Sequence, residues 1–230
     1  MSGVVSANLS PKAASMRQLC VNTVVLAGMA MTSLTASANI VGTGGAAVLA
    51  TPPADITNGL WTSNTEIRAW SERQTTLITN LVLDHAATGF INDPSQLVPG
   101  TVAAGTAVAS YMVRLDPANG GTHTLSGFVV FDTPILGVLQ DRGTLNASDI
   151  LLGRPGVTYN TNNNRGMELG SASDSDNFQI SADRLRIDFY MAVTNSPTDD
   201  IRIVTAIPAP GAMMAAMLGA ACLCRRRREV

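Results

Sequence analysis

The middle of the chain alternates between large apolar and polar side chains with a period of two, which is the repeat of an extended strand. The clearest example is residues 184–193, whose large apolar members are Leu185, Ile187, Phe189, Met191 and Val193. This segment predicts a strand with one buried face. Further strands are predicted at residues 66–72, 75–83, 135–139, 179–182 and 201–205.

Two more strand-like segments, 111–115 and 122–131, flank the turn residues 116–121. A turn between two alternating segments predicts a β-hairpin. Short strands separated by Gly, Asn, Asp and Pro are typical of an antiparallel β-sandwich or a jelly roll. No segment between the ends has a convincing helical period, and strands do not alternate with helices as they do around a parallel sheet. The predicted fold class is therefore all-β, with one sandwich domain at residues 39–207.

The first 38 residues have the three parts of a secretory signal peptide: a basic start, a short apolar centre and small residues at its end. Ala36 and Ala38 occupy the positions that signal peptidase requires before a cut at Asn39. The segment before the apolar centre is long and polar for such a signal, so Met1 and Met16 are both candidate start residues of translation. The sequence predicts export through the secretion translocon.

The last 23 residues begin with Pro208, Ala209 and Pro210, where the prolines interrupt regular structure. Residues 211–224 carry no charge and would form a helix about 21 Å long, short of the roughly 30 Å hydrocarbon core of a bilayer. Snorkelling arginine and local thinning of the bilayer cover part of this difference. Four basic residues follow and predict a cytoplasmic end: Arg225, Arg226, Arg227 and Arg228.

This order of features resembles the PEP-CTERM sorting tail of exported bacterial proteins. The matching parts are Pro208-Ala209-Pro210, the helix 211–224 and the basic stop 225–228, and Ala209 stands where the motif has glutamate. The resemblance implies recognition by an exosortase, a transpeptidase-like membrane enzyme, and transient anchoring in the inner membrane. It further implies removal of the tail, placement at the cell surface or in the extracellular matrix, and an association with exopolysaccharide or biofilm. An unprocessed C-terminal anchor is the alternative.

Three stretches, 127–138, 145–149 and 199–202, are similar to an uncharacterised ectodomain type that precedes such tails. This similarity implies a single domain and no particular activity.

Charge is distributed unevenly along the chain. The whole protein has a formal net charge of −2, but residues 39–207 contain nine Arg, no Lys and sixteen Asp plus Glu, a net charge of −7. An acidic body without lysine excludes nucleic acid as the expected partner. The same residues contain no Cys, which excludes a disulfide framework or a thiolate metal site in the body.

The common catalytic signatures are absent from the sequence, and we predict that the protein is not an enzyme. His85 and His123 are expected to be solvated turn residues. Glu66 and Glu72 are the candidate pair for a sandwich-fold glycoside hydrolase, the less favoured alternative. On one straight strand they would lie about 20 Å apart, too far for the usual pair of catalytic carboxyl groups. The sequence does not indicate a second catalytic carboxyl group to act with Glu168.

Two binding functions remain open. Acidic residues clustered in loops are candidate ligands of a structural calcium ion, and solvated acidic turns are the alternative; these residues are Asp174, Asp176, Asp199 and Asp200. Trp70 alternates in register with Arg68 and Glu72, which favours an exposed position and contact with carbohydrate. The sequence thus predicts an exported structural or exopolysaccharide-associated protein without a resident cofactor. A carbohydrate-binding module or a calcium-stabilised adhesin is the alternative.

Overall fold

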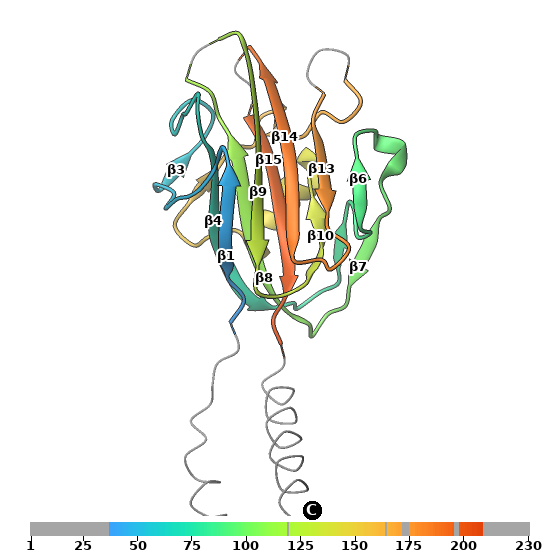
Figure 1. The fold of residues 1–230 in the computed structure, drawn as a ribbon. Coiled ribbons are helices and arrows are strands. Elements are labelled where there is room, and N and C mark those ends of the chain that lie inside the picture. The colour runs from blue at the N-terminus through green and yellow to red at the C-terminus, as the bar shows by residue number, and fades with distance from the viewer. Residues whose placement is uncertain (1–36, 119, 164, 172–174, 196–197, 209–230) are drawn as a thin grey trace, which may run out of the picture. The chain divides into compact units, whose positions relative to one another are not determined.

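The computed structural model describes residues 37–208, except residues 119, 164, 172–174 and 196–197. Two β-sheets pack face to face (Figure 1). Sheet 1 contains, in spatial order, β1 (Ile40–Gly45), β9 (Thr122–Phe131), β14 (Arg186–Thr194), β13 (Asn177–Ile180) and β6 (Gly89–Ile91). Sheet 2 contains β10 (Ile135–Leu139), β15 (Thr198–Ala206), β8 (Ala107–Leu115), β4 (Ile67–Thr76) and β2 (Ala47–Leu49).

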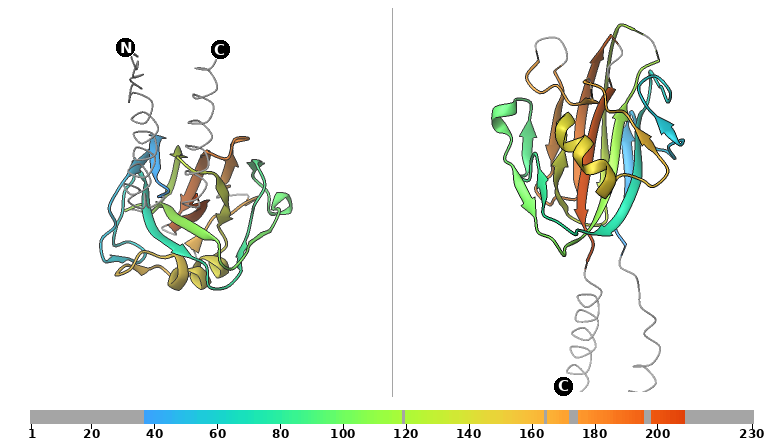
Figure 2. Two further views of the ribbon diagram at one scale, coloured as in Figure 1. Left: turned by 90° about the horizontal axis from the view of Figure 1, so that it is seen from below. Right: turned by 180° about the vertical axis from the view of Figure 1, so that it is seen from behind.

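Smaller elements extend sheet 2 or cover it. β12 (Arg165–Gly166) pairs with β15, β3 (Asp55–Ile56) pairs with β11 (Thr158–Tyr159), and β5 (Leu81–Leu83) pairs with β7 (Gly100–Val102). A 3-10 turn, η1, spans Pro94–Gln96. Helix α2 (Arg142–Leu152) lies across the outer face of sheet 2 (Figure 2). Most ladder pairs are antiparallel, which confirms the prediction of a mostly β fold with antiparallel sheets.

The period of two predicted the faces of β14 correctly. Ile187, Phe189, Met191 and Val193 are buried between the sheets, where they pack with Ile201 of sheet 2. On the opposite face of β14 only Ala192 is buried and the other residues are half-buried, because sheet 1 faces solvent there. Burial of one face against the other sheet is the usual source of stability in a sandwich.

Sheet 2 differs because both of its faces are covered. Its inner face joins the core between the sheets, and its outer face carries a second core in which Trp70 and Met112 pack against Leu145 and Leu152 of α2. β8 is accordingly buried at every position from Val108 to Leu115. A strand of this kind has no solvated face to contribute alternating polar residues.

The predicted hairpin of 111–115 with 122–131 is wrong. β8 belongs to sheet 2 and β9 to sheet 1, so the connection between them crosses from one sheet to the other. Turn residues specify that the chain reverses, but they do not determine which sheet receives the next strand. The predicted strand 75–83 is also interrupted, since β4 ends at Thr76 and β5 begins at Leu81.

Helix α2 contradicts the expectation that no helix forms between the ends. Asp141 begins it as the N-cap, and its Oδ1 accepts from the backbone N–H of Gly143 at 2.7 Å. Its buried positions are Leu145, Ser148 and Leu152. The helical spacing of three and four residues is thus present in the sequence, but a serine occupies the middle of the short buried stripe and hides the period.

The two ends of the described chain lie side by side (Figure 1). The backbone N–H of Asp132 donates to the carbonyl of Asn39 at 3.2 Å, just before β1. Two residues along the chain, the carbonyl of Pro134 accepts from Ala206, the last residue of β15, at 3.0 Å. We call the end of the sandwich where these contacts lie the terminal end, and the end at the other extremity of the strands the distal end.

Most of the predicted signal peptide (1–38) and sorting tail (208–230) lies outside the described residues. Ala38, Asn39 and Pro208 are described, whereas Ala36, Ala209, Pro210 and the arginine run are not. Within the ranges that the structure does describe, no helix is long and apolar enough to cross a membrane.

Candidate functional site

Three acidic side chains from distant parts of the sequence converge near the distal end. Glu168, Asp176 and Asp199 each present a carboxylate oxygen, and these oxygens lie within 4.8 Å of one another. Strand alternation places Asp199 on the same face of β15 as Ile201 and Ile203, which is the inner face of sheet 2. Asp199 precedes Ala206 by seven residues, so this acidic cluster lies about 23 Å from the terminal end.

Backbone hydrogen bonds hold Asp176 in place. Its Oδ1 accepts from the N–H of Ala192 on β14 at 2.7 Å, and its Oδ2 accepts from the N–H of Glu168 at 2.7 Å. The N–H of Asp176 in turn donates to the carbonyl of Glu168 at 3.3 Å. Asp176 thus lies just before β13 of sheet 1, tied to the segment that carries Glu168.

A glycine beside the acidic cluster lets that segment approach. Gly166 pairs with Asp199 in the β12–β15 ladder and has a φ of 125°. A Cβ on Gly166 would lie 2.5 Å from the carbonyl oxygen of Gln140. A larger residue is therefore excluded both by conformation and by space.

Asp199 is fully buried, at 0% exposure, and neither of its carboxylate oxygens accepts a hydrogen bond from a residue that the structure describes. Burial, followed by the neighbouring charges of Asp176 and Glu168, raises its pKa well above the usual value of aspartate. Burial also raises the pKa of Asp176, to about 7, although its two backbone N–H donors act in the opposite direction. The acidic cluster therefore favours binding a proton or a cation.

One side of the acidic cluster opens to solvent. Glu168 is half-buried and lines two adjoining hollows of about 760 Å³ and 340 Å³. The residues that line the larger hollow include Leu83, Pro94, Met167 and Leu169. An ion or water could therefore reach the acidic cluster past Glu168, while Asp176 and Asp199 stay out of reach of a larger ligand.

The metal candidates predicted from sequence have three different outcomes. Asp176 and Asp199 do come together, and Glu168, which sequence reasoning left without a partner, joins them. Asp200 is wrong as a candidate, because alternation directs it to the outer face of sheet 2, where Arg114 and Arg165 bind its two oxygens. Asp174 lies outside the described residues.

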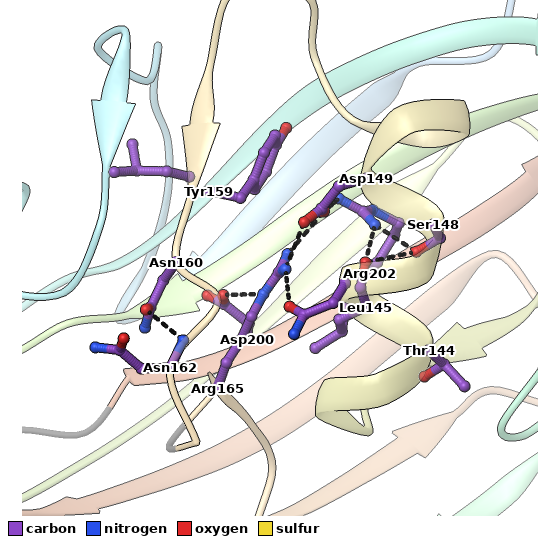
Figure 3. A network of polar contacts seen from close by, with 12 residues as sticks. Thr144, Leu145, Ser148, Asp149, Tyr159, Asn160, Asn162, Arg165, Asp200 and Arg202 are labelled. Carbon is purple, nitrogen blue, oxygen red and sulfur yellow. Dashed lines mark hydrogen bonds and ion pairs between the residues drawn. The ribbon is translucent and has the colours of Figure 1, made fainter.

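A buried ion-pair network fastens helix α2 to sheet 2 (Figure 3). Its charged members are Arg114, Arg165, Arg202, Glu72, Asp149 and Asp200. Arg202 donates to both oxygens of Glu72, at 2.6 and 2.7 Å, and to Asp149 of α2 at 2.8 Å. Burial alone would lower the pKa of Arg202, but Glu72 and Asp149 outweigh it and raise that pKa. The network is electrically balanced and holds the helix in place.

The network explains why Glu66 and Glu72 do not form a catalytic pair. Glu72 lies at a bulge in β4 and is fully engaged with Arg202. Glu66 precedes the strand, is partly exposed and lies 3.6 Å from Arg68. A glycoside hydrolase needs two accessible carboxyl groups across a cleft, and this pair does not meet that requirement.

The expectation that Trp70 is exposed is wrong. Its ring is at 0% exposure and packs edge-on against Trp61, with the ring centroids 5.3 Å apart. Trp70 does share a face with Arg68 and Glu72, as the sequence indicated, but α2 and the segment around Trp61 cover that face. The polar residues Arg68 and Glu72 on the same face suggested that this face contacts solvent. In the structure Glu72 forms a buried ion pair with Arg202, and Arg68 donates to backbone carbonyls.

His85 is likewise buried, at 1% exposure, and so is not the solvated turn residue expected from the sequence. Its Nδ1 accepts from the backbone N–H of Val98 at 3.1 Å, and its ring packs edge-on against Phe178. Burial lowers the pKa of His85. His123 is half-buried within β9. A neutral buried imidazole that accepts a backbone hydrogen bond has a structural role here.

No family model, curated protein or solved structure matches this chain in comparisons with all three. Its function therefore has to be inferred from its own residues and geometry.

The acidic cluster predicts an unusual dependence of stability on pH in protein freed of metal by a chelator. Asp176 and Asp199 bind protons more tightly in the folded than in the unfolded chain. The stability that protonation provides is therefore lost as pH rises through about 7. Thermal melts between about pH 5 and 8 should show the melting temperature falling as pH rises, most steeply below about pH 7, where the folded chain holds the proton and the unfolded chain does not.

Asp199→Asn is the matched variant for this pH series. It should flatten the dependence, because it removes one of the two coupled carboxyl groups. His85 titrates with the opposite sign, because burial lowers its pKa, but it contributes equally to both proteins and cancels in the difference. Identical slopes for the two proteins would contradict the assignment.

Proposed function

We propose that this chain is an exported, non-enzymatic protein whose jelly-roll-like β-sandwich domain is delivered by its two terminal segments and sorted by an exosortase-type system. Its destination is the cell surface or the extracellular matrix, after transient residence in the inner membrane. The observation that carries the proposal is that the first and the last residues of the domain lie together at its terminal end.

This arrangement suits a domain held by one end. The C-terminal segment begins at Pro208, two residues after the last residue of β15, so the proline motif directly adjoins the fold. A membrane helix beyond it would hold the terminal end near the bilayer and leave the distal end facing outward. The acidic cluster would then lie at the outward edge.

The contacts of Asn39 favour the proposed cleavage before it, whereas Ala38, which is buried in the core between the sheets, does not. The backbone nitrogen of Asn39 lies 2.7 Å from Oδ1 of Asp132, and its side-chain amide donates to the other carboxylate oxygen at 3.0 Å. Cleavage would turn that nitrogen into a charged amino group and the hydrogen bond into an ion pair. Ala38, whose carbonyl accepts from Gln74 at 2.9 Å, would be removed.

The proposed role is structural. Two of the three converging carboxylates are buried too deeply to contact a sugar, which argues against the glycoside hydrolase alternative. Burial of Trp70 likewise removes the stacking platform on which the carbohydrate-binding alternative depended. The association with exopolysaccharide is thus supported by the resemblance of the tail. The calcium-stabilised alternative gains support from the acidic cluster.

Mass spectrometry of the native protein tests the proposal. We expect the surface or matrix form to begin at Asn39 and to lack the arginine run 225–228. A variant without residues 1–38 is the control, and it should stay in the cytosol with its C-terminus intact. An exported form that keeps Arg225 to Arg228 would refute processing, and wild-type protein folded in the cytosol with both terminal segments intact would refute export.

A further inference from the structure

Two neighbouring aspartates of β15 are equally buried but differ in their hydrogen-bond partners. Asp200 faces the outer core and receives hydrogen bonds from Arg114 at 2.8 Å and from Arg165 at 3.1 Å. Asp199 faces the inner core, and no described residue donates a hydrogen bond to either of its oxygens. The charged groups that act on it are Asp176, Glu168 and Asp200, all acidic.

An ionised carboxylate in this position is costly without a positive partner. Removing a charge from water carries a large penalty that only a counter-charge or neutralisation offsets. Here two further carboxylates lie within 4.8 Å and add repulsion. Arginine neutralises the carboxylates on the outer face of sheet 2, so a bound cation is the equivalent solution on the inner face.

We propose that Glu168, Asp176 and Asp199 bind one calcium ion between the two sheets at the distal end. The ligand atoms are all carboxylate oxygens, which favour hard cations over zinc or copper. Oxygens bound to one calcium at about 2.3–2.6 Å lie no more than about 5 Å from each other, in agreement with the spacing here. The two backbone N–H bonds to Asp176 orient one ligand before the ion arrives.

Calcium suits the site better than magnesium. The three ligands come from sheet 1, sheet 2 and the segment after β12, and Glu168 borders an open hollow from which water can enter. Calcium accepts six to eight oxygen ligands in flexible geometry, whereas magnesium requires a nearly ideal octahedron. Water would complete the coordination on the side of Glu168.

Such an ion would link three separate parts of the fold. Asp176 is bonded to β14 in sheet 1, and Asp199 is part of β15 in sheet 2. Glu168 lies in the segment that follows β12. Calcium would thus join the two sheets at the distal end. This inference does not depend on export or processing of the protein.

Calcium titration of the full chain, kept soluble in a mild detergent and stripped of metal, tests the proposal. At about pH 7.5, where protons compete weakly with metal, calorimetry should show one site with a Kd of about 1 mM or tighter. A hundredfold excess over Kd should raise the melting temperature by roughly 5–10 °C.

Asp199→Asn should have effects of opposite sign in the two conditions. With chelator it should melt above the wild type, because a buried amide needs neither a proton nor a counter-charge and can donate a hydrogen bond to a neighbouring carboxylate. With calcium it should melt below the wild type and bind at least tenfold more weakly. Asp55→Asn is the matched control: Asp55 is exposed, and an asparagine oxygen can still accept from Thr57. It should respond to calcium as the wild type does.

Glu168→Gln is the second variant, since Glu168 is half-buried at the edge of the site and circular dichroism can check that the variant folds. It should also bind calcium at least tenfold more weakly. Failure of the wild type to bind calcium up to about 10 mM, beyond the range of extracellular calcium modules, would overturn the proposal. So would an unchanged affinity in whichever of the two variants folds, or binding of magnesium with no binding of calcium.

Discussion

Arg202→Leu is expected to lower the free energy of unfolding by about 3–5 kcal/mol, because it leaves a buried carboxylate without its counter-charge. The guanidinium of Arg202 makes two bonds to Glu72, at 2.6 and 2.7 Å, and both side chains are fully buried. It also holds Ser148 and Asp149 of α2, at 2.6 and 2.8 Å. The melting temperature should fall by roughly 10 °C or more, and urea unfolding provides an independent measurement.

Two companion variants separate the buried charge from the loss of a side chain. Glu72→Leu combined with Arg202→Leu should recover much of the stability, because replacing both partners of a buried pair by apolar residues is often nearly neutral. Arg186→Leu is the control. Arg186 pairs with Asp188 on the surface of β14, and both are about 40% exposed, so its loss should cost less than about 1 kcal/mol. Similar costs for Arg202→Leu and Arg186→Leu would contradict the assignment.

Local patterning was enough to predict several strands. β9 and β10 have the predicted bounds, and the buried face of β14 follows from its alternation. These properties are set by side chains two residues apart. The pairing of β8 with β15 and β4 is set by contacts across the whole chain. The sequence therefore predicted these elements but placed β8 in a hairpin with β9, and it missed α2, whose buried stripe includes Ser148.

The acidic cluster was predictable in part. Asp199 and Asp176 were identified as metal candidates because each lies in a short acidic segment. Glu168 is 31 residues from Asp199 in the sequence, and no local pattern connects the two. The strand prediction for 201–205 did contain one usable signal. Extended by two residues, its alternation places Asp199 on the face of Ile201 and Ile203, and Asp200 on the other. That step would have separated the metal candidate from the arginine-bound residue.

Trp70→Ala is expected to destabilise the fold by about 3–5 kcal/mol, the usual cost of removing a large buried aromatic side chain. The ring is fully buried in the core between sheet 2 and α2 and packs against Trp61. Nearby aliphatic residues cannot fill the space of an indole without moving the helix. Thermal and urea unfolding should both report the loss.

Trp70→Phe is the matched control, because it keeps an aromatic ring and removes an indole N–H for which the described residues provide no acceptor. It should cost less than half as much as Trp70→Ala. Retention on the extracellular polysaccharide, measured on the same proteins at a temperature where all remain folded, distinguishes burial from binding. A buried tryptophan predicts equal retention for all of them, since no sugar reaches the ring. A folded, stable Trp70→Ala that lost retention would contradict the buried position of Trp70 and restore a role in carbohydrate binding.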